Sequence, residues 1–148
     1  MADYKTIEAK RVIMGKLSCG GDLLEELTAV CQREKISLGT VAAIGAVQKA
    51  NIGYYDQHTR TYHFTEFNRP LEMASLTGNV SLKDGEPMVH AHITLADEKK
   101  TCVAGHLGPG TTVFACEFVI TVCGGADFVR EYDEQTGLPL WTFPSQTV

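Results

Sequence analysis

The stretch MVHAHITL at residues 88–95 alternates between two kinds of side chain. Successive side chains of a β-strand point to opposite faces of the sheet, so residues two apart share a face. Every second residue here is aliphatic, which predicts a half-buried strand with those residues in the core. The opposite face then carries His90 and His92 into solvent, a cleft or a subunit interface. The residues predicted to face the core are Val89, Ala91, Ile93 and Leu95.

A third histidine, His106, follows in the glycine-rich segment GHLGPG at residues 105–110. Two histidines at positions i and i+2 are commonly hydrogen-bonded surface residues, and the third one changes the interpretation. Three protein ligands with an open fourth position are typical of a catalytic zinc site, and imidazole nitrogens suit zinc. The sequence therefore predicts a metal site formed by His90, His92 and His106. Zinc is the favoured metal, and the choice among zinc, iron and manganese stays open.

The segment between the two histidine-bearing strands decides whether this site can form. Asp97–Lys100 has the character of a turn, so the flanking strands should pair as an antiparallel hairpin. Residues that face each other in such a pair share a side of the sheet. His106 then joins His92 only if the loop has an odd number of residues, or if a bulge, for example at Gly105, shifts the register. A two-residue turn at Glu98-Lys99 would place His106 on the wrong face.

A lone carboxylate, Glu117, interrupts the apolar strand predicted at residues 112–123. Alternation places Glu117 away from the core, and it shares a face with the histidines if both strands belong to one sheet. Glu117 is therefore the candidate catalytic residue, as a general base, as a residue behind the ligands or as a further ligand. A salt bridge across the sheet is the alternative. The predicted core face of this strand is Phe114, Cys116, Phe118, Ile120 and Val122.

The composition and charge exclude several classes of protein. The chain has 148 residues, the usual size of one domain, and needs no disulfides to bury a core. Its net charge of −5 opposes nonspecific binding to nucleic acid. No apolar run approaches membrane-spanning length, and the N-terminal residues lack the apolar region of a signal peptide. Five cysteines without a CxxC pair fit a cytoplasmic protein with reduced thiols.

The pattern along the chain indicates an α+β fold. One amphipathic helix follows Asp22, a good N-cap, and two similar turns at 55–59 and 132–137 predict hairpins. We predict a single domain, 1–148, in which one principal helix packs against a strongly curved or barrel-like, mainly antiparallel sheet. The core covers about residues 5–133, and 134–148 form a C-terminal tail. The predicted strands are residues 5–17, 41–44, 50–55, 61–67, 71–82, 88–96, 101–107, 112–123 and 127–132.

Six short motifs in this order resemble the plants-and-prokaryotes-conserved (PPC) domain family, the stand-alone prokaryotic type. They are GGDLL at 20–24, AIGAV at 43–47, SLTGNV at 75–80, HAH at 90–92 after Pro87, GHL at 105–107 and EFVI at 117–120. The resemblance covers about residues 5–133. It implies an α+β fold, a homotrimer, a metal site at His90, His92 and His106, and a distant fold kinship with acetolactate decarboxylase, a metal-dependent enzyme that uses three histidines.

Three functions are consistent with these features of the sequence. The first is a metal-binding homotrimer that acts on or senses a small molecule, and the sequence leaves open whether it is an enzyme. The second is a DNA-associated regulatory module, because the family is often labelled DNA-binding through plant members that carry AT-hooks. This chain has no Arg-Gly-Arg-Pro-like core, and its acidic balance disfavours DNA. The third is an oligomeric scaffold whose histidines are only structural.

Overall fold

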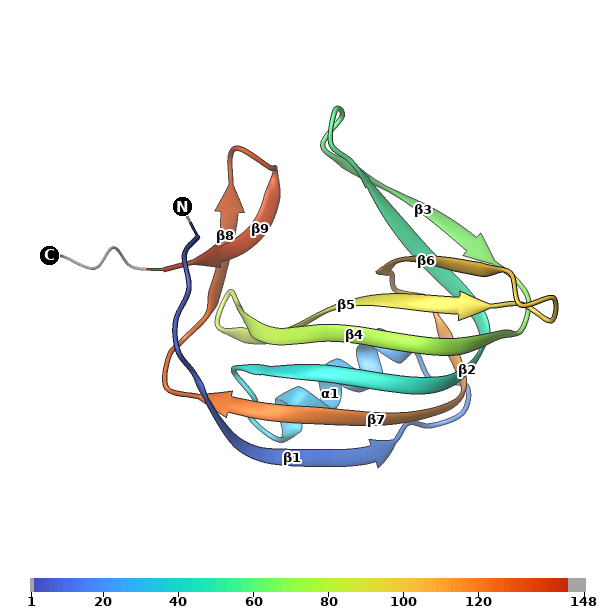
Figure 1. The fold of residues 1–148 in the computed structure, drawn as a ribbon, viewed down its shortest axis with the longest axis horizontal. Helices are drawn as coiled ribbons and strands as arrows, with labels where there is room; N and C mark the ends of the chain where they lie inside the picture. The colour runs from blue at the N-terminus through green and yellow to red at the C-terminus, as the bar shows by residue number, and fades with distance from the viewer. Residues whose placement is uncertain (1, 144–148) are drawn as a thin grey trace, which may run out of the picture.

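The computed structural model describes residues 2–143. This part of the chain forms one α-helix and a single sheet of nine strands, mostly antiparallel (Figure 1). The predicted α+β class, with one helix against a mainly antiparallel sheet, is confirmed. The elements are β1 (Glu8–Lys16), α1 (Leu23–Arg33), β2 (Gly39–Asp56), β3 (Thr61–Phe67), β4 (Leu71–Lys83), β5 (Glu86–Ala96), β6 (Cys102–Leu107), β7 (Thr112–Gly124), β8 (Val129–Asp133) and β9 (Leu138–Thr142).

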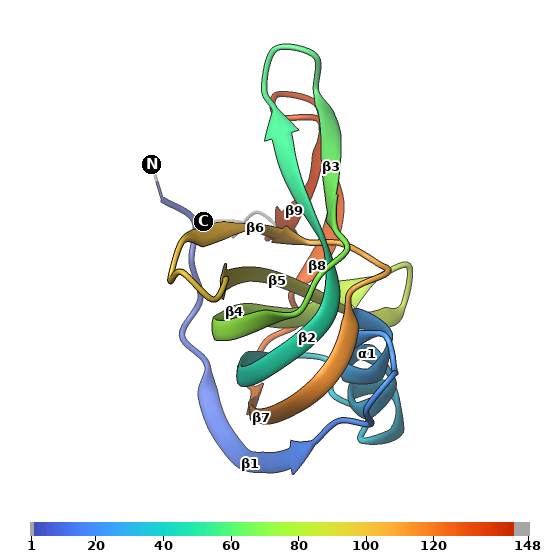
Figure 2. The ribbon, with the colours of Figure 1, turned by 90° about the vertical axis from the view of Figure 1, so that its right-hand side faces the viewer.

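The long strand β2 closes the sheet on itself. Its first half pairs with β4 and β7, and its second half pairs with β3 and β6. Because β4 also pairs with β5, and β5 with β6, these three strands and β2 form a closed ring (Figure 2). A bulge beside Gly45, where φ is 147°, bends β2 between its two halves. The predicted barrel-like curvature is confirmed.

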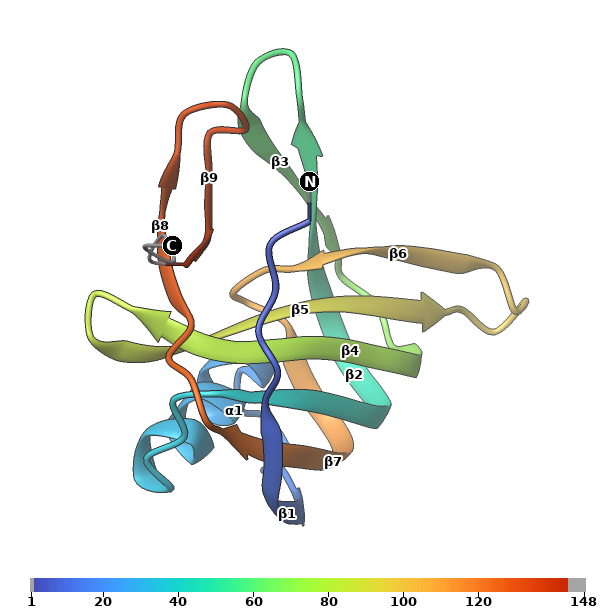
Figure 3. The same cartoon turned by 60° about the vertical axis from the view of Figure 1, so that its left-hand side comes forward.

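The helix α1 begins where the sequence predicts it, because Asp22 caps its first turn. The Oδ1 atom of Asp22 accepts hydrogen bonds from the backbone N–H groups of Leu24 and Glu25, each at 3.0 Å. The helix packs on the core side of the sheet against β5 (Figure 3). In the described part of the chain no helix is long and apolar enough to span a membrane. The buried residues of α1 are Leu23, Leu27, Val30 and Cys31.

Two hairpins, β2–β3 and β8–β9, project from the end of the molecule opposite α1 and meet near their tips (Figures 1 and 3). The Tyr55 hydroxyl donates a hydrogen bond to the Thr136 carbonyl at 2.7 Å. The Arg60 guanidinium donates another to the Glu134 carbonyl at 3.0 Å. The two similar turns in the sequence are thus confirmed as hairpins. We call the two hairpins, joined by these bonds, the hairpin arch.

Two strand assignments from the sequence are corrected. The segments predicted as separate strands at 41–44 and 50–55 are parts of the single strand β2. The segment predicted as a tail, 134–148, contains the strand β9, although its proline is unfavourable in a strand interior. The rest of that prediction, residues 144–148, lies outside the described residues.

The alternation predicted for β7 fails at its beginning. Val113 is fully buried, whereas Phe114, predicted to face the core, is 60% exposed. Ala46 and Val47 of β2 pair with Ala115 and Val113 of β7, so Phe114 is the extra residue of a bulge that shifts the pairing by one residue. A one-residue shift exchanges the two faces of a strand, so the alternation predicted from the sequence holds only beyond the bulge.

Gly78 lets β4 approach the histidine-bearing strand β5. It pairs with Ala91, the residue between His90 and His92, and a Cβ added at Gly78 would lie 2.3 Å from the His90 carbonyl oxygen. We expect Gly78→Ala to lower the free energy of unfolding by about 2 kcal/mol, because the backbone of β5 must move. Urea unfolding measures this loss. Ser75→Ala, at an exposed position of β4, should change the same quantity by less than about 0.5 kcal/mol. Equal effects of the two substitutions would contradict this account.

Candidate metal centre

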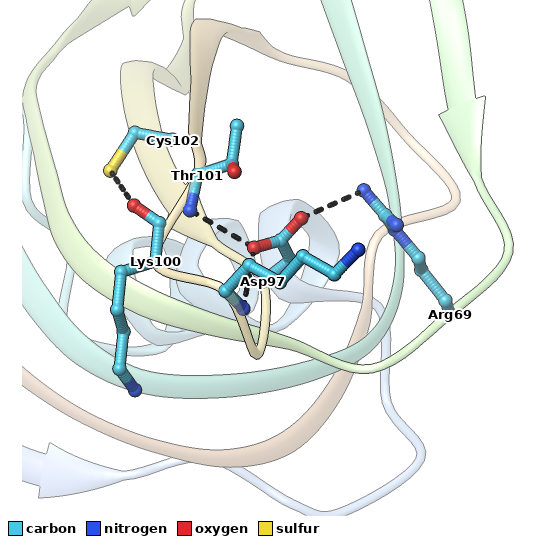
Figure 4. A network of polar contacts seen from close by, with 6 residues as sticks. Arg69, Asp97, Lys100, Thr101 and Cys102 are labelled. Carbon is cyan, nitrogen blue, oxygen red and sulfur yellow. Dashed lines mark hydrogen bonds and ion pairs between the residues drawn. The ribbon is translucent and has the colours of Figure 1, made fainter.

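The turn between β5 and β6 sets the register of the two histidine-bearing strands. Five residues, 97–101, separate the paired ends of these strands. The Oδ1 atom of Asp97 closes the turn by accepting hydrogen bonds from the backbone N–H groups of Lys99 at 2.9 Å and Thr101 at 3.0 Å (Figure 4). Its Oδ2 atom forms an ion pair with Arg69 at 3.6 Å. The loop therefore has the odd length that the predicted site requires.

The three histidines converge on one face of the sheet. His92 and His106 are directly opposite each other in the β5–β6 pair, so the predicted condition on the register is met. His90 lies two residues along β5 on the same face. The ring centroids are 5.4 Å apart for His90 and His92, 5.0 Å for His90 and His106, and 5.6 Å for His92 and His106. One nitrogen from each ring lies within 4.8 Å of the other two, so this group could hold a metal ion.

One atom of the group has no partner within the described chain. The Nδ1 atom of His106 is buried and makes no hydrogen bond to any described residue. Buried polar atoms are rarely left unpaired, so this nitrogen fits a metal ligand. Two nitrogens bound to one tetrahedral zinc ion lie about 3.3 Å apart. The observed limit of 4.8 Å is larger, so rotations of the side chains would have to bring the three nitrogens closer to a common ion.

The surroundings keep His90 and His106 unprotonated at neutral pH. Burial, together with the nearby Arg130 guanidinium and the other two histidines, lowers the pKa of His90 from 6.5 to about 4. Burial also lowers the pKa of His106, with contributions from His92 and Arg130. A metal ion binds the neutral form of imidazole. The site therefore presents ligands that need no deprotonation at neutral pH.

An aromatic wall from β3 covers one side of the centre. The Tyr62 ring lies 4.7 Å from the His106 ring between centroids, and the Phe64 ring lies 6.4 Å from it. The ring of Tyr55, which anchors the hairpin arch, packs against Tyr62 in a tilted arrangement with the centroids 5.0 Å apart. Burial raises the pKa of the Tyr62 hydroxyl above its ordinary value. His106 is thus shielded from solvent by apolar ring surface, while His92 remains exposed.

The structure adds a residue that sequence reasoning missed. Arg130 of β8 is buried, and its Nη2 atom lies 3.5 Å from the Nδ1 atom of His90. Its Nε donates to the Ser81 hydroxyl at 2.9 Å, its Nη1 to the Pro139 carbonyl at 2.9 Å and its Nη2 to the Asn79 side-chain oxygen at 2.7 Å. Nothing in the local sequence separates Arg130 from an exposed strand arginine, because its neighbours come from β4, β5 and β9.

Glu117 shares the outward face of the sheet but not the histidine cluster. It is exposed on β7, opposite Lys16 of β1. The strands β2 and β4 lie between β7 and β5, so Glu117 is about 14 Å from His92, at about 4.8 Å for each of three strand spacings. The structure therefore separates Glu117 from the candidate metal ligands of the same chain. The two remaining histidines, His58 and His63, are exposed on the β2–β3 hairpin.

The fold of this chain is shared with known proteins. The sequence profile of the Plants and Prokaryotes Conserved (PCC) domain matches residues 4–124. The chain belongs to this family. The match includes all three histidines and Glu117, and it ends before Arg130.

Solved structures of other proteins resemble this PCC-domain chain closely. A metal-containing protein from Archaeoglobus fulgidus is 37% identical, with a TM-score of 0.91 over 96% of this chain and all of the other. A plant- and prokaryote-conserved (PPC) protein from Pyrococcus horikoshii is 30% identical, with a TM-score of 0.90 over 97% and 99% of the two chains. A protein from Bacteroides thetaiotaomicron, called a "putative DNA binding protein", is 25% identical, with a TM-score of 0.83 over 94% and 99%.

Two curated relatives are much longer than this PCC-domain chain. Both are called bifunctional protein GlmU and come from two strains of Synechococcus, JA-2-3B'a(2-13) and JA-3-3Ab. Each is 32% identical, over 82% and 86% of this chain respectively. The chain spans only 18% and 20% of their lengths, so it corresponds to a minor part of each relative.

The lowered pKa of His90 makes the stability of the metal-free protein depend on pH. An unfolded His90 takes up a proton below about pH 6.5, whereas the folded one does so only near pH 4. The unfolded state therefore binds more protons between these values, and the free energy of unfolding falls as the pH falls through this window. We expect urea unfolding in the presence of a chelator to show this loss between pH 7.5 and pH 5. The loss should be smaller in His90→Gln and unchanged in His63→Gln, and equal slopes in all three proteins would refute it.

Proposed function

We propose that this PCC-domain protein is a metal-binding homotrimer that acts on or senses a small molecule through His90, His92 and His106. The observation that carries the proposal is the buried, unpartnered Nδ1 atom of His106 beside two further imidazoles. Three neutral nitrogen ligands with a free fourth position favour zinc, and other divalent metals are alternatives. The relative from Archaeoglobus fulgidus, described as metal-containing, supports the metal over the whole length of the chain.

In such a site the metal and the residues of the chain would have different roles. A bound zinc ion would supply a Lewis acid that polarises a carbonyl group or activates water. The three imidazoles would hold it, while Tyr62 and Phe64 exclude water from the side of His106. The group that could hold the metal contains no carboxylate. Sensing of a ligand and catalysis with a proton acceptor supplied by the substrate or by water both fit this arrangement.

A homotrimer, which the family resemblance implies, has support in an exposed apolar surface. We call this surface the outer apolar face. Its members are Met14, 75% exposed, and Val12, Ile44 and Phe114, each about 60% exposed. Met14 and Ile44 line the same depression of about 680 Å³. A monomer in water rarely exposes this much contiguous apolar surface, so we infer that other copies of the chain cover it.

The outer apolar face adjoins the candidate metal centre. One row of paired residues runs across the sheet from Met14 through Val119, Ala42 and Thr77 to His92. Thr77 is exposed and separates the apolar residues from the exposed His92 ring. A second copy seated on the outer apolar face would therefore lie close to the open side of the histidine group, which is where a small molecule would enter.

DNA binding is the second candidate, because the names of relatives point to it. The proteins from Bacteroides thetaiotaomicron and from Ralstonia eutropha, 25% and 28% identical, are both called "putative DNA-binding" proteins. The net charge of −5 argues against it, because contacts to phosphates require a basic surface. We therefore favour the metal site as the functional centre.

The metal proposal predicts one zinc ion per chain after loading and removal of excess metal. The His92 side chain is exposed and does not pack in the core, so His92→Ala should fold normally. It should bind zinc at least about 100-fold more weakly than the wild type. His63→Ala, at an exposed histidine on β3, serves as the control and should bind like the wild type. Elemental analysis and competition with a chromophoric chelator measure both quantities. Wild-type protein that takes up no metal, or His92→Ala that binds like the wild type, would end the proposal.

The trimer proposal predicts that charge on the outer apolar face separates the subunits. Met14 and Ile44 are exposed in the single chain, so replacing both by glutamate leaves the core intact but opposes burial of the face. We expect sedimentation analysis to give three copies for the wild type and one for the double variant. Tyr132→Glu, at an exposed aromatic residue of β8, should leave the trimer unchanged. A wild type that sediments as a single chain would exclude the trimer.

A further inference from the structure

Among residues 2–143, the buried cation Arg130 has only neutral hydrogen-bond partners. Its side chain is 7% exposed, and it donates hydrogen bonds to a hydroxyl, an amide oxygen and a carbonyl, those of Ser81, Asn79 and Pro139. None of the ion pairs found within residues 2–143 includes it. Removing a charge from water is costly unless an opposite charge compensates it. A neutral amide side chain could make similar bonds without that cost, so the positive charge requires a separate explanation.

The hydrogen bonds of Arg130 leave part of its donor capacity free. A guanidinium carries five N–H groups. Three of them are used by Ser81, Asn79 and Pro139, which leaves one on each terminal nitrogen. Nη2 also lies 3.5 Å from Nδ1 of His90, so the free end of the guanidinium borders the metal centre. The Trp141 ring, 5.5 Å from the guanidinium carbon, packs on the side chain and helps to fix its position.

Loading the histidine group with a divalent metal makes the charge balance worse. Histidine binds a metal ion in its neutral form, and the group contains no carboxylate. A divalent ion and the Arg130 guanidinium would then stand side by side in a half-buried site with a local charge of about +3 and no compensating anion from the described chain. An anion that contacts both cations removes this repulsion. The same anion would use the free N–H groups of Arg130 and the open position of the metal.

The surroundings narrow the chemistry of that anion. A guanidinium and a carboxylate fit as planar partners with two parallel hydrogen bonds. Phosphate also pairs with arginine, but the rings of Tyr62 and Phe64 beside His106 offer apolar surface to an organic group. The bond from Tyr55 to Thr136 joins the hairpin that carries Tyr62 to the hairpin that carries Arg130. A small organic acid satisfies the charge, the donors and the apolar wall together.

We propose that Arg130 makes the three-histidine site a receptor for a small organic carboxylate, the substrate or ligand class of the centre. This inference rests on the proposed function, because the carboxylate is expected to contact the bound metal as well as Arg130. It explains why a charged residue is buried beside residues that would bind another cation. Arg130 is a binding residue for the carboxylate in this account, and its bonds to β4 and β9 hold it in place.

The test uses full-length protein loaded with cobalt(II), whose visible spectrum reports a change of ligands, and acetate as the probe. We expect acetate to shift the spectrum in a saturable manner and acetamide, its neutral analogue, to have no effect. Arg130→Gln should weaken acetate binding at least about tenfold while cobalt remains bound. Arg33→Gln, which removes an exposed charge from α1 on the other side of the sheet, should bind acetate like the wild type.

Each other outcome decides the proposal. Cobalt binding with equal acetate affinity in the wild type and Arg130→Gln would overturn the carboxylate site and leave the metal site standing. Failure of the wild type to bind cobalt would overturn both. Inorganic phosphate that binds more tightly than acetate, with dependence on Arg130, would overturn the carboxylate class. If circular dichroism shows that Arg130→Gln does not fold, Arg130→Lys replaces it in the test. Lysine keeps the positive charge but lacks the planar, two-pronged donor group of the guanidinium. Arg130→Lys should therefore bind acetate at least about fivefold more weakly than the wild type.

Discussion

The pairing of His92 with His106 across β5 and β6 is the constraint on which the candidate centre depends. A slip of one residue would turn the His106 ring into the core side of the sheet and leave two histidines without a third. The five-residue loop that Asp97 closes prevents this slip, since its side chain holds two backbone N–H groups and an arginine. The Asp97 carboxylate is not one of the candidate metal ligands, yet through the loop it determines whether the three imidazoles can bind one ion.

Closure of the sheet gives this centre its walls. The strand β2 pairs with four other strands, and the bulge at Gly45 lets its second half leave the barrel as part of the β2–β3 hairpin. That hairpin carries the aromatic rings that cover His106, and its contact with the β8–β9 hairpin forms the arch. The same fold leaves the outer apolar face unpartnered beside His92. The centre is therefore covered by its own chain beside His106 and open beside His92, toward the face that we propose a neighbouring copy covers.

Local charge and total charge have opposite signs in this molecule. The chain is acidic as a whole, yet the centre contains three imidazoles and a buried guanidinium, and the histidine group includes no carboxylate. Such a site holds a metal through neutral ligands and attracts an anion through what surrounds them. The total charge bears on association with a polyanion such as DNA, whereas the local charge bears on the small molecule. The net charge of the chain therefore disfavours DNA as a ligand, whereas the local charge around the histidines favours a small anion.

The sequence by itself determined the elements that follow from local periodicity. The alternation of residues 88–95 gave the face of His90 and His92, Asp22 gave the start of the helix, and the odd loop gave a condition that the register fulfils. The tertiary structure decided which residues at the beginning of β7 face the core, and it added the strand β9. It also decided how far Glu117 lies from the histidines and that Arg130 contacts His90. The physical reason is that alternation specifies on which face a side chain lies. It does not specify the order of strands in a sheet, nor where a bulge reverses the two faces. Those depend on contacts between residues far apart in the chain.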